Sequence, residues 1–273
     1  MKSDKTTFWD HLEVVRWVLI RCLAVVVLLA VGAFCYKDFL FDRVVLAPCH
    51  PDFATYRALC LLGQWLGMPD LCPRVQPVEL ININLSSQLM THLSVSFYVA
   101  LLVALPYILV EVWLFVSPAL YARERKPAVA GVVAFFFQFF LGLLLAYYII
   151  FPLTFQFLGT YQVSASICNQ ISLNSYISTF LGLLFTMALV FEMPIVAYFF
   201  ARIGVLTSAW LRKYRKVAFV VSLVAAAIIT PSTDVFTMML VALPLYALYE
   251  FSRLIVRRVE RLNTENNKIK KIS

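Results

Sequence analysis

The sequence predicts an all-α, polytopic integral membrane protein with six transmembrane helices and both termini in the cytoplasm. Three observations predict this class: apolar residues make up 62% of the chain, charged residues make up 14%, and 19 of the 23 basic residues fall in four clusters between long apolar stretches. Soluble domains have about 45–50% apolar and about 25% charged residues. By the positive-inside rule the clusters mark the cytoplasmic side. The net charge of +8 therefore reports topology and does not indicate nucleic-acid binding.

Six apolar stretches are predicted as spans of one membrane domain covering residues 1–273. The spans are 17–36, 93–120, 128–158, 176–201, 217–230 and 235–251. An even number of spans places both termini on one side, and the basic segment 252–273 is predicted as a cytoplasmic tail. The first stretch is long enough to remain as an uncleaved helix. The fifth is shorter than the roughly 20 residues that cross a bilayer. It either re-enters or is buried in protein, or it spans a thinned membrane, and we favour the short span.

Prolines shape the predicted helices. Four lie inside spans, where each removes a backbone hydrogen bond and bends its helix: Pro106, Pro152, Pro194 and Pro244. Bent helices form a concave wall. Pro118 instead lies at the cytoplasmic turn after the second span, where a structural role is predicted.

The loop between the first two spans, about residues 37–84, carries balanced charge and is predicted to face the far side. Helical spacing of apolar residues after Asp52 predicts a helix there. Cys60 and Cys72 are predicted to form a disulfide, with Cys49–Cys168 as a second candidate pair and four free thiols as the alternative. The sequence has no paired CxxC and no histidine cluster, so no metal site is predicted.

Carboxylates within the spans are the main candidates for function. Glu192 and Glu111 lie inside predicted spans, where a charged side chain costs on the order of 2.5–3.5 kcal/mol and usually serves a function. The structural alternative is a protonated Glu192 that is hydrogen bonded across the bundle, for instance to Gln138. Glu250 lies three residues before Arg253, a spacing that favours an ion pair on one helix face.

The chemistry that the sequence lacks narrows the function. It contains no GxxxxGK[ST], HExxH or GxSxG motif, so neither a nucleotide-driven pump nor an enzyme is predicted, and no cofactor is expected. A proton- or ion-coupled small-molecule transporter would use Glu192 and Glu111 as titrating sites, but the internal repeats common in such proteins are not visible. A membrane enzyme, the third alternative, has no nucleophile or metal set to support it.

Short motifs occur along most of the chain in a fixed order. They are His11-Leu12 with Arg16, Ala47-Pro48, Pro106 with Val112-Trp113 and Phe115, Ser117-Pro118-Ala119-Leu120-Tyr121 followed by Arg123-Glu124-Arg125, Phe151-Pro152-Leu153, Phe191-Glu192-Met193-Pro194, Thr230-Pro231 with Asp234-Val235-Phe236, and Pro244 with Tyr246 and Glu250. In this order and in register with six spans, they resemble the TatC family, the receptor subunit of the bacterial twin-arginine (Tat) protein translocase.

The resemblance implies a fold, a function and a location. The fold would be a concave, glove-like arrangement of six helices in the bacterial cytoplasmic (inner) membrane, with structural roles for Pro48, Pro106, Pro118 and Glu250. The protein would bind twin-arginine signal peptides of folded precursors. With TatA- and TatB-type single-span partners, and with self-association, it would mediate export driven by the protonmotive force.

The resemblance also implies two groups of site residues. Signal-peptide binding would use Glu124, because a carboxylate accepts two parallel hydrogen bonds from a guanidinium. The second family glutamate falls on Val14, so Glu13 or Asp10 is expected to contribute, beside Arg16 and Arg123. Contacts with partner or substrate inside the membrane would use a second set: Glu192, Pro194, Asp234, Thr237, Met238 and Glu111. Many relatives carry glutamine at the Met238 position.

Overall fold

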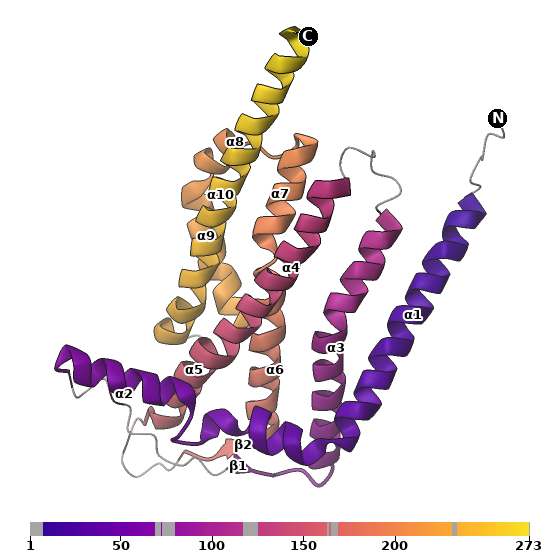
Figure 1. The fold of residues 1–273 in the computed structure, drawn as a ribbon. Coiled ribbons are helices and arrows are strands. Elements are labelled where there is room, and N and C mark those ends of the chain that lie inside the picture. The colour runs from indigo at the N-terminus through magenta and orange to yellow at the C-terminus, as the bar shows by residue number, and fades with distance from the viewer. Residues whose placement is uncertain are drawn as a thin grey trace. The chain divides into compact units, whose positions relative to one another are not determined.

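The computed structural model describes residues 8–68, 72, 80–116, 125–162, 164, 169–230 and 234–272. Helices dominate the described chain (Figure 1), which confirms the predicted all-α membrane class. Within these ranges, five helical stretches are long and apolar enough to cross a membrane. They are Glu13–Cys35, Ser87–Val112, Gly131–Thr160, Leu173–Ile203 and Val235–Arg261.

The fifth predicted span, residues 217–230, falls on the helix α9 (Arg215–Ile229). That helix has 15 residues, which is roughly 22 Å at 1.5 Å per residue. It is shorter than the hydrocarbon core of about 30 Å, so its passage through the membrane stays a prediction. The predicted tail from residue 252 continues the last helix, α10 (Val235–Ile272), without a break in the backbone.

The chain forms two compact units. The first contains Met1–Ala47 and Asn82–Phe136, and the second contains Pro48–Ile81 and Phe137–Ser273. The helix α4 (Arg125–Leu145) begins in the first unit and ends in the second. Membership of both units in one six-helix membrane domain stays a prediction.

The first unit is built on two long helices, α1 (Phe8–Cys35) and α3 (Ser87–Val116), which lie side by side (Figure 1). They are antiparallel, because Arg21 in the middle of α1 contacts Glu111 near the end of α3, whereas Phe34 near the end of α1 stacks on His92 near the start of α3, with ring centroids 4.0 Å apart. A π-helix, Phe39–Val45, follows α1. The α1 and α3 helices are apolar on every side, as a span facing lipid on one side and protein on the other requires.

The second unit contains the remaining elements in chain order. They are a 3-10 turn (Ala47–Cys49), α2 (Ala54–Leu66), β1 (Leu80–Ile81), the end of α4, a π-helix (Ala146–Ile150), α5 (Phe151–Thr160), β2 (Ile171–Ser172), α6 (Leu173–Val190), α7 (Met193–Ile203), α8 (Ser208–Lys213), α9 and α10. The two short strands pair in parallel, Leu80 with Ile171 and Ile81 with Ser172. They are too short to change the fold class.

The helix predicted after Asp52 is α2, and it is anchored at the π-helix of the second unit. Pro152 has no N–H for the carbonyl of Tyr148, four residues earlier, and the Thr55 hydroxyl donates a hydrogen bond to that carbonyl. The buried Tyr56 hydroxyl donates to the Pro48 carbonyl at 3.1 Å and to the Pro152 carbonyl at 3.3 Å. The buried Pro48 thus takes part in holding α2, which gives physical content to its predicted structural role.

The helices α7, α8 and α10 share a small apolar core. Its buried members are Ala201, Leu211, Val256 and Val259. Gly204 ends α7 in a left-handed conformation with φ 82°, which glycine adopts without steric cost. Thr207 then caps α8 by accepting a hydrogen bond from the Trp210 N–H at 3.3 Å. The tight turn between the caps lets Leu211 pack against α10.

Candidate functional site

Of the predicted receptor residues, the structure describes the side chains of two, Glu13 and Arg16. Glu13 and Arg16 are exposed on α1. Asp10 is a residue of α1, but its side chain is outside the described part of the structure. Glu124, Arg123 and Pro118 lie outside the described residues altogether.

The register of the two antiparallel helices relates Glu13 to the segment that follows α3. The Arg21 guanidinium lies 3.4 Å from the Glu111 carboxylate, so these residues are at the same level. Glu13 precedes Arg21 by eight residues, about 12 Å along the helix axis. Eight residues beyond Glu111 the chain has passed the end of α3. The exposed Glu13 therefore lies beyond the level at which α3 ends.

Glu192 lies between α6 and α7, where the membrane-spanning stretch of the second unit is interrupted. Pro194 cannot donate a backbone hydrogen bond, and a new helix starts there, with the Glu192 carbonyl accepting from the Ile195 and Val196 N–H groups, both at 3.1 Å. The sequence predicts that Pro194 bends a single helix, whereas the structure has a break between two helices, α6 and α7. Glu192 is the N-cap residue of α7, and its side chain forms no cap hydrogen bond.

The Glu192 carboxylate is buried without a hydrogen-bond partner. The residue is 5% exposed, and neither carboxylate oxygen bonds to any group in the described ranges. The hydrogen bond to Gln138, which the structural alternative proposed, is accordingly not formed. A carboxyl group in this position carries unused hydrogen-bonding capacity, which costs free energy until a partner supplies it.

The backbone next to Glu192 is fixed by a close helix contact. A Cβ atom built on Gly142 of α4 would lie 2.7 Å from both Cβ and Cγ of Phe191, and 3.0 Å from the Met187 carbonyl oxygen. Only glycine leaves room for this approach. Phe191 itself is 4% exposed. The position of the break, and with it of Glu192, depends on this contact.

Glu111 differs from Glu192 because its carboxylate is satisfied within the first unit. It is 6% exposed, and it accepts a hydrogen bond from the Tyr107 hydroxyl at 2.7 Å and one from Arg21 at 3.4 Å. Its function as a partner contact stays a prediction, and any partner would compete with two groups that already bind it.

Asp234 and Thr237 form the start of α10. The Asp234 carboxylate accepts hydrogen bonds from the Thr237 N–H at 2.8 Å and from the Thr237 hydroxyl at 2.6 Å, which is an N-cap arrangement. Thr237 is fully buried, and Met238 is half-buried beside it. Within the described chain, no hydrogen bond joins this group to Glu192.

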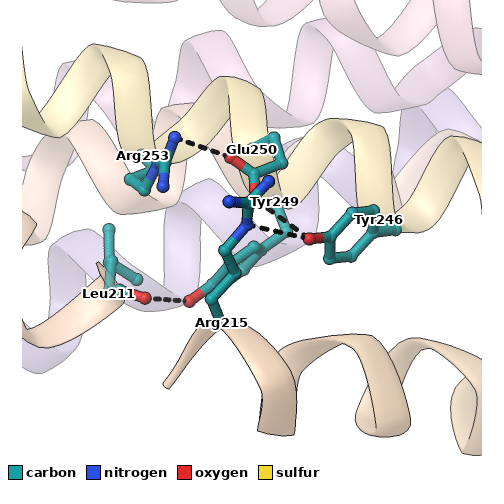
Figure 2. A network of polar contacts seen from close by, with 6 residues as sticks. All are labelled: Leu211, Arg215, Tyr246, Tyr249, Glu250 and Arg253. Atoms are coloured by element: carbon teal, nitrogen blue, oxygen red, sulfur yellow. Dashed lines mark hydrogen bonds and ion pairs between the residues drawn. The ribbon is translucent and has the colours of Figure 1, made fainter. Parts of the chain in front are cut away.

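Glu250 is the centre of a polar network that ties α9 to α10 (Figure 2). Its carboxylate lies 3.0 Å from Arg253, the partner that the sequence spacing predicts, and 2.5 Å from Arg215. Tyr246 donates to the same carboxylate at 3.1 Å and accepts from Arg215 at 3.0 Å. These hydrogen bonds with Tyr246 and Glu250 raise the pKa of Arg215, so its charge is held in the network. The predicted structural role of Glu250 has a direct physical basis in these contacts.

The structure contains a disulfide between Cys60, in the middle of α2, and Cys72, with Cα atoms 4.2 Å apart. This separation lies below the limit of about 7 Å beyond which a bridge cannot form. Cys49 carries a free thiol, and burial raises the pKa of that thiol. Cys168, its proposed second partner, lies outside the described residues.

Three features of the structure were not expected from the sequence. Arg21 pairs with Glu111 across 90 residues, Arg215 pairs with Glu250 across 35 residues, and the N–H and hydroxyl of Ser208 both donate to the Glu260 carboxylate. In the described part of the chain, no group of three or more His, Cys, Asp or Glu side chains could hold a metal ion.

Comparisons with known proteins find a matching family, similar sequences and a similar solved structure. The family model described as Sec-independent protein translocase protein (TatC) matches residues 10–244. The chain is 32% identical over 256 residues to the Sec-independent protein translocase protein TatC of Blattabacterium sp. subsp. Periplaneta americana, covering 92% of this chain and 96% of that protein. It is 37% identical over 202 residues to TatC of Helicobacter pylori, covering 74% and 79%. A crystal structure of the twin arginine translocase receptor TatC superposes with a TM-score of 0.69 at 30% identity, covering 92% of this chain and 99% of that one.

Proposed function

The chain belongs to the TatC family of Sec-independent protein translocase proteins, and we propose that it is the subunit that binds twin-arginine signal peptides of folded precursors. It is a core component of the Sec-independent translocation system, and the family consists of translocase components rather than enzymes. The observation that carries the proposal is the structural likeness to a solved twin arginine translocase receptor over nearly the whole length of both chains.

The proposed receptor site combines Glu124 with Glu13. Each carboxylate can accept two parallel hydrogen bonds from one guanidinium, and lysine cannot replace that planar donor. Glu13 is exposed and lies beyond the level at which α3 ends, eight residues before Glu124 in the chain, so the register of α1 and α3 supports a shared site. Arg16, Arg123 and Asp10 would set the local charge around it. Glu13 compensates in this proposal for Val14, which is exposed and offers no acceptor.

The proposed partner site combines Glu192 with the break at Pro194. A buried carboxyl group with two free oxygens can accept or donate hydrogen bonds to an inserted signal peptide or to a TatA- or TatB-type helix. Asp234, Thr237, Met238 and Glu111 are further contact residues of this proposal. The protonmotive force would drive transport, in keeping with the missing nucleotide-binding motif of the sequence.

The proposed location is the bacterial cytoplasmic membrane, with both termini inside. The support is the segregation of basic residues, 19 of 23 of which fall in clusters that the positive-inside rule assigns to the cytoplasm. Under this orientation α2 and the Cys60–Cys72 disulfide face an oxidising compartment, where disulfides persist.

The receptor proposal is tested by photo-crosslinking a twin-arginine precursor to the protein in membrane vesicles. We expect the Glu124→Arg substitution to abolish crosslinking, because it replaces an acceptor with a repelling charge, and Glu13→Ala to reduce it. Added salt should weaken binding of the unsubstituted protein. Asp42→Arg is the matched control, since Asp42 is an exposed acid beyond the other end of α1.

A precursor with two lysines in place of its arginines should crosslink poorly to every form of the protein. Crosslinking of the twin-arginine precursor that is unchanged by Glu124→Arg, in protein that is still inserted in the membrane, would contradict the receptor site.

A further inference from the structure

A basic pocket lies between α8 and the second half of α10, apart from every proposed receptor and partner residue. Its volume is about 130 Å³, and it is lined by Ser208, Arg212, Arg253, Leu254 and Arg257. Three of the five lining side chains are thus guanidinium groups, which form paired hydrogen bonds to phosphate oxygens.

The walls of the pocket are held by the apolar core of the second unit. Leu211 is buried against Val256 and Val259, and its carbonyl accepts a hydrogen bond from the Tyr249 hydroxyl at 2.6 Å (Figure 2). These contacts hold the adjacent Arg212, a residue of α8, beside α10. Arg253 and Arg257 are four residues apart and therefore lie on the same face of that helix. The pocket exists before any ligand arrives, so little ordering is needed to fill it.

Within the described part of the chain, one of the three pocket arginines, Arg253, has an acidic partner. Arg253 pairs with Glu250, but Glu250 also pairs with Arg215 (Figure 2). Neither Arg212 nor Arg257 forms an ion pair with an acid in the described part of the chain. The Glu260 carboxylate accepts from the Ser208 N–H at 2.8 Å and from its hydroxyl. Like charges four residues apart on a helix destabilise it, and an anion between the arginines would remove that repulsion.

The surroundings of the pocket identify the kind of anion. Arg253 and Arg257 lie in the last third of the candidate span Val235–Arg261, after its long uncharged stretch. Leu254, in the pocket wall, is 52% exposed, and Phe251, one turn earlier, is 49% exposed. Trp210, on α8, is also half-exposed, as aromatic residues at a membrane interface commonly are. A ligand here meets arginines on one side and exposed apolar side chains on the other.

We propose that this pocket binds the phosphate group of an anionic phospholipid, with its acyl chains along the exposed apolar face of α10. Basic pockets between helices at the membrane edge recognise lipid headgroups in this way. A twin-arginine signal peptide is a poor ligand for it, because the pocket would repel the two guanidinium groups of the peptide.

Native mass spectrometry of the full chain in detergent tests the proposal, with phosphatidylglycerol, phosphatidylcholine and inorganic phosphate as separate probes. Two arginines near a lipid surface contribute about 1 kcal/mol each, so we expect Arg212→Gln/Arg257→Gln to weaken phosphatidylglycerol binding about thirty-fold. Arg258→Gln/Arg261→Gln is the matched control: it removes the same charge from exposed positions of α10 outside the pocket and should change affinity less than three-fold. Arg257→Lys, which keeps the charge but loses the planar donor, should fall between them.

Three results would overturn the proposal. Equal losses in the two double variants would show a diffuse charge effect and no site. Equal binding of phosphatidylglycerol and phosphatidylcholine would remove the requirement for an anionic lipid. Displacement of phosphatidylglycerol by inorganic phosphate at equal concentration would identify a site for free phosphate.

Discussion

Gly142→Ala should destabilise the second unit, because the added methyl group has no room. Its Cβ would lie 2.7 Å from two atoms of Phe191, well inside ordinary van der Waals contact. Overpacking of this kind costs about 1–3 kcal/mol, while replacing glycine with alanine inside a helix gains roughly 0.5–1 kcal/mol. We expect a net loss of about 1–2 kcal/mol.

Gly182→Ala is the matched control. Gly182 lies in α6, and nothing is within 4 Å of the Cβ that alanine would add. This variant should therefore keep or raise the stability of the protein through its helix propensity alone. The measurement is thermal unfolding in detergent, followed by circular dichroism, where 1 kcal/mol corresponds to a shift in Tm of about 2–4 °C for a chain of 150–250 residues.

A double-mutant cycle attributes the effect to one contact. Phe191→Leu removes ring atoms from the position that the new methyl group needs, so Gly142→Ala should destabilise a Phe191→Leu protein less than it destabilises the unsubstituted one. Transport should fall in the Gly142→Ala protein as well, because Phe191 precedes Glu192. If Gly142→Ala unfolds at the same temperature as Gly182→Ala, the close approach of α4 to α6 is wrong.

Three further substitutions test other parts of the structure. Glu192→Gln should keep much of the transport activity, because an amide preserves hydrogen bonding. Glu192→Ala should lose transport or partner crosslinking. If the Gln and Ala variants are equally inactive while their crosslinks stay normal, Glu192 is instead a titrating site. Replacing Cys60 and Cys72 together with serine should lower the free energy of unfolding of the loop by about 3 kcal/mol in the chain-entropy model, measured as faster proteolysis of membrane vesicles from the far side. Glu250→Gln should cost about 1.5–3 kcal/mol in thermal unfolding, the value of hydrogen bonds to a charged group, and adding Arg215→Gln should cost less than the sum of the two single losses.

The membrane helices could be predicted from the sequence because their signal is local. Long apolar runs and the positions of basic residues are enough to find α1, α3, α4 and α10. Pro194 predicts a bend in the fourth span, where the structure has a break between α6 and α7. The pairing of Glu250 with Arg253 is also local, since three residues on a helix bring two side chains together.

The long-range contacts could not be predicted, because no short pattern connects their members. The approach of Gly142 to Phe191 depends on how α4 lies against α6, and in the sequence Gly142 is one apolar-flanked glycine among others. Arg215 was interpreted only as a marker of orientation. Its contact with Glu250 requires α9 to return beside α10, which follows from packing and not from periodicity.

The exposed surface of the short helix α9 indicates how the predicted fifth span lies in the membrane. Five of its exposed apolar residues form one stripe along the helix: Val217, Val220, Val221, Val224 and Ile228. A sixth, Phe219, lies outside the stripe, and its ring contacts that of Tyr246. If α9 were buried in its own protein, this face would be covered. If α9 were re-entrant, the helix would turn back partway through the membrane. The stripe instead runs along most of the length of α9. A continuous apolar face roughly 17 Å long finds its most favourable surroundings in hydrocarbon. Because that length is below the ~30 Å of an unperturbed bilayer, the exposure pattern favours a short span with a locally thinned membrane over a segment buried in protein.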